Sequence, residues 1–426
     1  GWQGHCATGE LMQNALRESL EMATIVQENT SRVPAIDSGA KALAMVKAML
    51  PEITTASKLS DAHRQLPHDL VDKMRDLGLF GLVMPKSLGG SELGFRDLVE
   101  VTIEIGSACG SAAWIYGVLA GHSWLINLFP EQAQREIMAD PRTLLGTVFR
   151  LGGEVVPEGD GYRLTGGNGR FCSGIDYATW IIIGNAVKHP DGTLEPRFFV
   201  VPKSEIEIVD DWFTMGMRGT GSRSIKIDST FIPAHRSCKL SDMIAGTAPG
   251  SKVHGGAKYR MPFSDLSPFS IVGAPLGMAR GMIRRFSEDI GNRLKDDSPQ
   301  SLGEQSVTFA RIAEASATVD AAIALVLADA EMVDNAQDPS DITPLQRIAI
   351  PRNWAFAVQT ARHAANRIFE ATGGSSIYED SDIQQVFRDI NGGSQHFAFT
   401  WDTAMNNFGR VQCGFDPLAF VVRRKS

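Results

Sequence analysis

The spacing of apolar residues changes twice along the chain and divides it into three parts. From about residue 40 to 140 the apolar positions recur with a helical period. From about 143 to 236, short β-branched and aromatic segments alternate with Gly, Asp and Pro turns, which predicts strands. Helical spacing returns from Leu266 onward. We therefore expect a leader or tail over 1–38, an N-terminal helical domain over 39–141, a central β domain over 142–247 and a C-terminal helical bundle over 248–426.

The helices can be bounded by Gly and Pro, which interrupt the helical pattern. They are predicted over Lys41–Leu50, His68–Leu77, Ile271–Leu294, Val307–Val333 and Pro344–Thr372, and a long apolar pair of helices is predicted over Phe95–Phe129. The first is expected to end at Pro51 and the second at Gly78, and Pro351 either kinks or starts the last. A helix-like stretch over Glu10–Gln27 belongs to the N-terminal segment, whose role the sequence leaves open.

The middle of the chain predicts a small β unit. Strands are expected over Thr143–Phe149, Tyr162–Thr165, Thr179–Ile183, Arg197–Val201 and Ser224–Phe231. The turns between them are too short to hold crossover helices, which parallel strands require, so we expect an antiparallel barrel or sandwich. The predicted fold class is therefore α+β.

Charge and cysteine content exclude several classes of partner. The 41 basic and 49 acidic side chains give a net charge of −8, so neither nucleic acid nor an anionic membrane is expected to bind. The uncharged stretch Ala108–Phe129 contains His122 and Asn127 and is predicted to be a buried helix, not a membrane span. The five cysteines form no C-x-x-C pair, so we expect no disulfide framework, no metal site and a cytoplasmic location.

The usual nucleotide and hydrolase motifs are missing from the sequence. The run RGTGS over 218–222 looks like part of a dinucleotide loop, but it precedes a strand and lacks the third glycine. The chain has no Walker A motif, no H-E-x-x-H and no nucleophile elbow. An enzyme of this sequence therefore has no NAD(P)H fingerprint of its own.

Three segments carry a resemblance to a known family: LPHDLVDKMRDLGLFGLVMPKSLGG, GMRGTGSRSIKIDSTFIPAHR and ATGGSSIYEDSDIQQVFRDI. Together with the order of the domains, they resemble the acyl-CoA dehydrogenase superfamily, which implies a C-terminal four-helix bundle and a homotetramer. The segments GHSW, RFCSGIDYATW and RDINGGSQHFAFTWD are most similar to the oxygenase components of two-component flavin monooxygenases. These include the hydroxylases of p-hydroxyphenylacetate and phenolic secosteroids, and dibenzothiophene monooxygenase.

The carboxylate base of the dehydrogenases is missing at the matching positions. One position holds Phe397, beside His396, and the alternative position holds Ser267. This departure argues against α,β-desaturation. An acyl-CoA dehydrogenase or oxidase with a displaced base, Asp265, remains an alternative because Asp265 lies only two residues from Ser267.

The resemblance implies an oxygenase that receives reduced FMN or reduced FAD from a separate NAD(P)H:flavin reductase. Reduced flavin and O2 would form a C4a-hydroperoxyflavin, which hydroxylates an aromatic substrate, phenolic or polycyclic. Two further alternatives remain open: an oxygenase that uses the same adduct on nitrogen or sulfur, and a helical scaffold without activity.

Three residues are candidates for catalysis by this resemblance. Ser173 matches the residue that binds flavin N5, and Phe171 matches an aromatic packed on the isoalloxazine. Two residues apart on a strand, both side chains should lie on one face. His122 is expected near flavin and substrate, and His396 is expected to accept or donate a substrate proton with a pKa near neutrality.

Other matched residues are candidates for binding. A turn role would explain Arg218, Thr220 and Ser222 equally well, and aromatics at helical spacing are more often plain core. The flavin-binding candidates are Thr147, Val148, Phe149, Phe171, Ser173, Arg218, Thr220, Ser222 and Arg293, the last near the arginine that reaches a neighbouring subunit's flavin phosphate. The candidates for an aromatic substrate pocket are Trp114, Tyr116, Trp124, Tyr259, Phe263 and Phe397.

Overall fold

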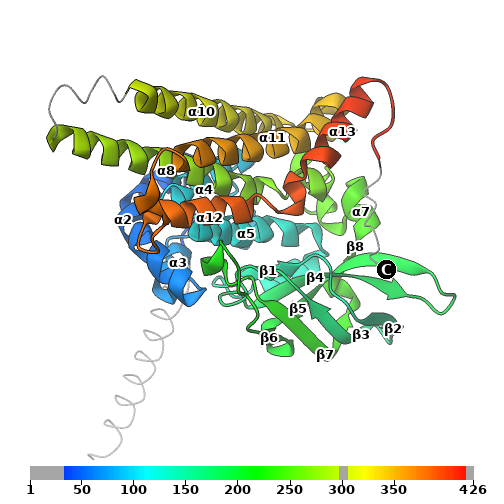
Figure 1. Cartoon of the computed structure of the whole chain (residues 1–426). Helices are drawn as coiled ribbons and strands as arrows, with labels where there is room; N and C mark the ends of the chain where they lie inside the picture. The colour runs from blue at the N-terminus through cyan, green and yellow to red at the C-terminus, as the bar shows by residue number, and fades with distance from the viewer. Residues whose placement is uncertain (1–32, 297–305, 419–426) are drawn as a thin grey trace, which may run out of the picture.

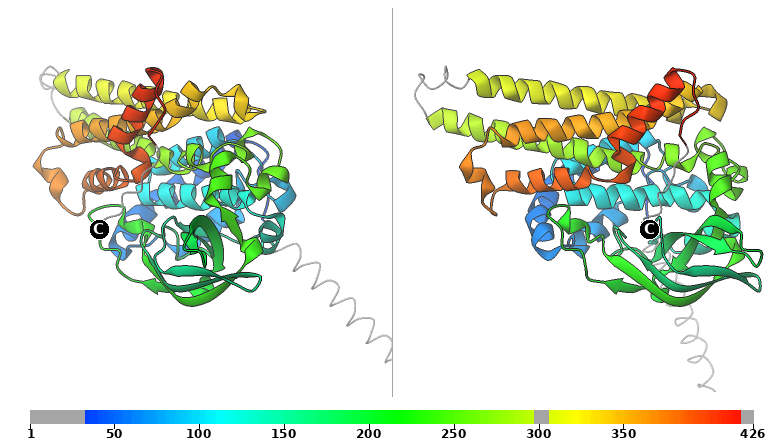
Figure 2. Two further views of the ribbon diagram at one scale, coloured as in Figure 1. Left: turned by 90° about the vertical axis from the view of Figure 1, so that its right-hand side faces the viewer. Right: turned by 45° about the vertical axis from the view of Figure 1, so that its right-hand side comes forward.

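The computed structural model describes residues 33–296 and 306–418 of the chain. Within them, a helical part, a sheet and a second helical part follow one another, as the sequence predicts (Figure 1). The helices form the upper layers in Figures 1 and 2, and the twisted sheet lies below them. The stretch Glu10–Gln27 lies outside the described residues.

The N-terminal helices pack around one element, α5, which is apolar on all sides. The helices of this part are α2 (Gly39–His63), α3 (His68–Asp76), α4 (Phe95–Gly106), α5 (Gly110–Leu125) and α6 (Glu131–Ile137). Every residue of α5 is buried. The prediction of a buried helix in this stretch is confirmed, and among the described residues no helix is both long and apolar enough to cross a membrane.

One predicted helix end is wrong. Helix α2 does not stop at Pro51 but continues to His63, with Pro51 in its interior. Proline removes one backbone hydrogen bond and favours a break. Here Val46, Met49 and Ile53 bury one face of the helix on both sides of Pro51, and that packing holds the helix together. The predicted end of α3 before Gly78 is confirmed, since Gly78 has a positive φ of 80°.

The sheet is mixed and open, which corrects the predicted antiparallel barrel or sandwich. Its path is β6-β7-β3-β2-β4-β5-β8, and β1 pairs with β4. Strand β4 is parallel to both β1 and β2. The β2–β3 hairpin lies between β1 and β4 in the chain and provides the crossover, so no helix is needed. The strands are β1 (Leu145–Val148), β2 (Glu154–Glu158), β3 (Gly161–Gly169), β4 (Trp180–Lys188), β5 (Leu194–Pro202), β6 (Glu207–Val209), β7 (Ser224–Pro233) and β8 (Ser237–Lys239).

Long helices form the C-terminal part, above α5 in Figure 1. They are α8 (Phe269–Asp296), α10 (Ser306–Asn335), α11 (Pro344–Phe369), α12 (Asp382–Gly393) and α13 (Trp401–Gln412), preceded by the short α7 (Leu240–Ala245). Helix α11 starts at Pro344, where Thr343 and Gln346 form a capping box, and it continues through Pro351. Helix α5 contacts α8 and α12 of this part and β1 of the sheet, so it lies where all three parts meet.

Candidate active site

His122 lies in the last turn of α5 and faces strand β1. Its Nδ1 is 2.7 Å from the backbone oxygen of Leu145 and 3.2 Å from Oγ1 of Thr147. A carbonyl oxygen only accepts hydrogen bonds, so Nδ1 carries the ring hydrogen and Nε2 keeps a free lone pair. Burial lowers the pKa of His122 to about 4. The ring is therefore neutral near pH 7 and is an acceptor at Nε2.

His396 lies just after α12 and caps the short helix η12 (Phe397–Phe399). The backbone N–H of Ala398 donates to its Nδ1 at 3.3 Å, so the hydrogen of the neutral ring is on Nε2. The two histidines are therefore opposite tautomers. Burial lowers the pKa of His396 to about 4, which corrects the expected value near neutrality.

Strand β1 connects the surroundings of the two histidines. Thr147 lies beside His122, and Phe149, two positions later, follows the last residue of β1. The ring centre of Phe397 lies 6.1 Å from that of Phe149 and 4.4 Å from that of His396. On the other side of His396, Trp114 of α5 packs edge-to-face at 5.5 Å. We call His122, His396, Trp114, Phe149 and Phe397 the histidine region.

The predicted aromatic pocket is only partly brought together. Phe263 reaches the histidine region through Phe198, which contacts Phe149. Tyr116, Trp124 and Tyr259 instead pack in the helical core, against Phe80, Phe95 and His254 respectively. Val148 also points away, into the core of the sheet. Core and pocket aromatics on a helix have the same spacing, so the sequence had no signal to separate them.

Ser173 lies in a loop after β3 and joins two other predicted residues. Its Oγ is 2.6 Å from Oγ of Ser222, which is 2.7 Å from Oγ1 of Thr220. We call Ser173, Ser222 and Thr220 the hydroxyl chain. A Cβ on Gly174 would lie 2.9 Å from the Leu119 side chain, so the Ser173 loop rests directly on α5.

The expectation that Phe171 and Ser173 share a strand face is wrong. Strand β3 ends at Gly169, and Phe171 has a positive φ of 67°, which interrupts the alternation of an extended strand. The Phe171 side chain is 67% exposed and contacts Trp212, whereas Ser173 is 9% exposed. A left-handed aromatic residue in the open is strained, and such strain occurs most often at ligand sites.

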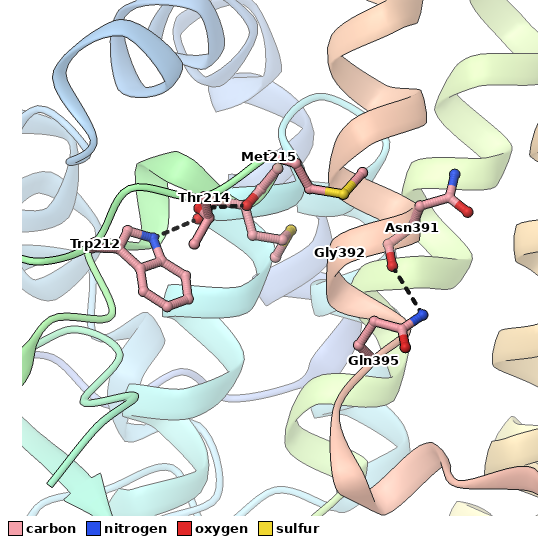
Figure 3. Close-up of a pocket in the computed structure, with 8 residues that line it drawn as sticks. Trp212, Thr214, Met215, Asn391, Gly392 and Gln395 are labelled. Atoms are coloured by element: carbon pink, nitrogen blue, oxygen red, sulfur yellow. Dashed lines mark hydrogen bonds between the residues drawn. The ribbon is translucent and has the colours of Figure 1, made fainter.

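A pocket of about 410 Å³ opens between the loop before η5 (Arg218–Thr220) and the end of α12. Figure 3 shows Trp212 and Met215 on the loop side and Asn391 and Gln395 on the helix side. The pattern analysis missed Trp212 and Met215, which belong to no motif. The pocket combines apolar walls with amide groups, the lining that flat ring systems with polar edges need.

The residues next to this pocket fit a flavin. Among the described residues, Nε of Arg218 is buried and has no hydrogen-bond partner, and the nearest Asp61 oxygen is 3.9 Å away. Arg218 forms only a long ion pair with Asp61 and its side chain is 37% exposed, so its guanidinium can also pair with an anionic ligand such as a phosphate. Arg293 lies near the C-terminal end of α8, and its side chain is outside the described part.

Asp389 of α12 holds the loop that carries the hydroxyl chain. Its Oδ1 accepts the backbone N–H of Met217 at 2.6 Å, where Met217 has a positive φ of 55°. Burial raises the pKa of Asp389 to about 7. The Arg388 guanidinium beside it donates to Asp61 and to the Met215 carbonyl. Helix α12 therefore positions the loop from the bundle side.

The alternative dehydrogenase base, Asp265, is bound elsewhere. Its carboxylate is paired with Arg347 of α11 at 3.2 Å. Burial raises the pKa of Asp265, an effect that the nearby Arg347 guanidinium only partly offsets.

Family models place the chain among known proteins. The acyl-CoA dehydrogenase N-terminal domain matches residues 42–141, and the acyl-CoA dehydrogenase C-terminal domain matches residues 269–401. The chain belongs to the acyl-CoA dehydrogenase family. Its middle residues, with the hydroxyl chain, lie between the two matched domains, so their assignment rests on the geometry described above.

Within this family, the similar proteins are oxygenases. The oxygenase component of p-hydroxyphenylacetate 3-hydroxylase from Acinetobacter baumannii is 31% identical over 89% of this chain and 90% of its own length. A pigment production hydroxylase from Rhodococcus sp. is 31% identical over 88% of this chain and 97% of its own. The crystal structure of the HsaA monooxygenase from M. tuberculosis has a TM-score of 0.83 and 29% identity, and the match covers 90% of this chain and 99% of that one.

Proposed function

We propose that this protein is the oxygenase component of a two-component flavin-dependent monooxygenase. It would take reduced FMN or reduced FAD from a separate reductase and use O2 to hydroxylate an aromatic, phenolic substrate. The observation that carries the proposal is a pair of neutral histidines in opposite tautomers, His122 buried and His396 half-buried, beside one aromatic region. The similarity to oxygenase components over almost the whole chain supports it.

The histidine region provides what a phenol needs. Nε2 of His122 accepts the hydrogen of the substrate hydroxyl. As that proton moves to the imidazole, electron density rises in the aromatic ring of the substrate. Nε2–H of His396 donates a hydrogen bond and orients the substrate. The rings of Trp114 and Phe149 favour a flat substrate and exclude water from it.

A flavin would lie between the hydroxyl chain and the pocket along α12. When bound in its reduced form, it supplies the two electrons with which one oxygen atom enters the substrate and the other becomes water. Arg218 would pair with the flavin phosphate, Trp212 and Met215 would pack on its apolar parts, and Ser173 would bind N5. Phe171, exposed beside Trp212, would close over the ring edge.

We also propose that the protein is a homotetramer. The rings of Phe356 of α11 and Trp401 of α13 lie tilted against each other with their centres 6.4 Å apart, and the two residues remain 43% and 39% exposed. Exposed aromatic pairs on an outer helical face are typical of subunit contacts. Light scattering on the purified protein should give four times the chain mass.

The function is tested by loading the protein with reduced FMN without oxygen and then adding an oxygen pulse together with a panel of phenols, amines and sulfides. The wild type is expected to hydroxylate a phenol. Ser173→Ala should release hydrogen peroxide in place of most of the product, because the hydroxyl that binds N5 is lost. Ser229→Ala, on the exposed face of β7, is the matched control. Unchanged coupling in Ser173→Ala would remove Ser173 from the mechanism, and oxidation of only an amine or a sulfide would change the substrate class.

A further inference from the structure

The hydroxyl chain ends on a group that can only accept hydrogen bonds. The backbone oxygen of Met217 receives Oγ1–H of Thr220 at 2.8 Å and the indole N–H of Trp212 at 3.1 Å. A threonine hydroxyl has one hydrogen to donate. The hydrogen of Thr220 is therefore committed to Met217, and Thr220 must accept at its other contact.

The direction of every other bond in the chain follows from this end. Because Thr220 accepts, Ser222 donates to it at 2.7 Å. Because the one hydrogen of Ser222 is then used, Ser173 donates to Ser222 at 2.6 Å. Ser173 is left with lone pairs only, and its free side is an acceptor.

The Met217 end of the hydroxyl chain is fixed, so the order of donors and acceptors cannot be reversed there. The Met217 N–H is bound by Asp389, and its carbonyl receives both donors named above. A Cβ on the preceding residue, Gly216, would lie 2.2 Å from the Arg388 carbonyl oxygen, so the backbone of this loop lies directly against α12. In a reversed chain, Thr220 would donate to Ser222, and its lone pairs would face the Met217 carbonyl oxygen at 2.8 Å, a repulsive contact between two acceptors.

Reduced and oxidised flavins differ in whether N5 donates or accepts a hydrogen bond. A reduced flavin carries a hydrogen on N5 and donates it, whereas N5 of an oxidised flavin has a lone pair and accepts. An acceptor facing N5 stabilises the first form and repels the second.

We propose that Thr220 and Ser222 direct the Ser173 hydroxyl so that it accepts the N5 hydrogen, and that this direction makes the protein prefer reduced over oxidised flavin. The proposal rests on the function proposed above, because it places N5 against Ser173. Thr220 and Ser222 are positioning residues, since they act through Ser173. No covalent step is involved.

Binding affinities for the two redox forms test the proposal without turnover. The dissociation constants of oxidised FMN and, without oxygen, reduced FMN are measured for the wild type, Ser222→Ala and Thr220→Val. Either substitution lets the Ser173 hydrogen turn towards N5, so the preference for reduced FMN should fall about tenfold, the effect of roughly one hydrogen bond. The midpoint potential of bound FMN should fall by about 30 mV, the equivalent of that ratio for two electrons.

Two matched variants separate this effect from a general loss of packing. Thr220→Ser keeps the hydroxyl and should keep the preference. Thr230→Val removes another buried hydroxyl, in β7 and outside the chain, and should also keep it. The comparison of Thr220→Val with Thr220→Ser suffices if Ser222→Ala does not fold.

The possible outcomes distinguish this proposal from the one on which it rests. Reduced-to-oxidised preferences that are equal in the wild type, Ser222→Ala and Thr220→Val would overturn the direction of the chain as the source of selectivity. A wild type that binds neither form of FMN nor of FAD would instead overturn the proposed function.

Discussion

The hydroxyl chain and the histidine region both border α5, but they control hydrogen in different ways. In the hydroxyl chain, each of three side-chain hydroxyls donates to the next group, and the last donates to a backbone carbonyl. The positions of these groups fix which atom is the donor in each bond. In the histidine region, each ring has a single backbone partner that selects its tautomer, and burial keeps it neutral. The first is a polar network with an ordered direction, and the second is an apolar environment with two fixed imidazoles.

This difference predicts how each region responds to change. A network transmits the loss of one hydroxyl to the next, so its members should act together. Isolated imidazoles in apolar surroundings should act separately, and each should respond to pH. The predictions below follow that contrast from the largest expected effect to the smallest.

The largest effect is expected for His122→Gln. Glutamine can still donate to the Leu145 carbonyl, but it lacks the basic Nε2 lone pair. Hydroxylation by the oxygen-pulsed, flavin-loaded protein should fall roughly a hundredfold or more, with the affinity for reduced flavin nearly unchanged. His189→Gln, in the β4–β5 turn, is the control. A nearly normal rate in His122→Gln would show that this imidazole carries no proton in the reaction.

The next largest effect is expected in the dependence of the free energy of unfolding on pH, which should differ between the two regions. Burial lowers the pKa of His122 to about 4 from its usual 6.5, so between these values the unfolded chain binds a proton that the folded protein does not. The free energy of unfolding should therefore fall as the pH falls from about 6.5 to 4. His122→Gln should remove a few kcal/mol of this loss, since one pKa unit corresponds to about 1.4 kcal/mol.

Asp389, which holds the loop of the hydroxyl chain, should give the opposite slope of the free energy of unfolding against pH. Both slopes are measured by urea titration at a series of pH values. The pKa of Asp389 is raised from 3.8 to about 7, so the folded protein keeps a proton that the unfolded chain releases. This contribution to stability is lost as the pH rises from about 4 to 7. Asp389→Asn should make that arm shallower, leaving the share of other buried carboxyls such as Asp329, and should leave the histidine arm intact. Identical pH profiles of the variant and the wild type would contradict the buried, protonated state of Asp389.

The smallest effect is expected for Thr147→Val. Thr147 is the second and longer contact of His122 Nδ1, at 3.2 Å against 2.7 Å for the Leu145 carbonyl. The carbonyl alone should hold the tautomer, so the hydroxylation rate should change less than about threefold. A loss as large as that of His122→Gln would mean that Thr147, and not the carbonyl, orients the ring.

Local sequence patterns predicted the helices and their ends correctly where the residues of the segment alone determine them. The apolar stretch over α5 and the glycine end of α3 needed only the residues themselves. The end at Pro51 failed because tertiary packing of α2 outweighs one lost hydrogen bond. The wholly antiparallel sheet failed because a strand hairpin can replace the crossover helix between parallel strands, and only the pairing of β1 and β2 with β4 reveals this.

The candidate site divides along the same line. The motifs that resemble the flavin monooxygenases proposed Ser173, His122 and His396 as candidates, without any knowledge of their neighbours. They did not find Trp212 or the role of Asp389, because both act through contacts between distant segments. They also placed Phe171 on the wrong face, because a left-handed backbone angle leaves no mark in a strand-like pattern.

The sequence by itself determined the order of helices and strands and the burial of α5, since these depend on local composition and period. The candidate catalytic side chains came from its resemblance to a known family. The tertiary structure alone decided the tautomers of the two histidines, their lowered pKa values and the direction of the hydroxyl chain. Each of these properties depends on which distant backbone group a side chain meets, and on how completely other elements exclude water from it.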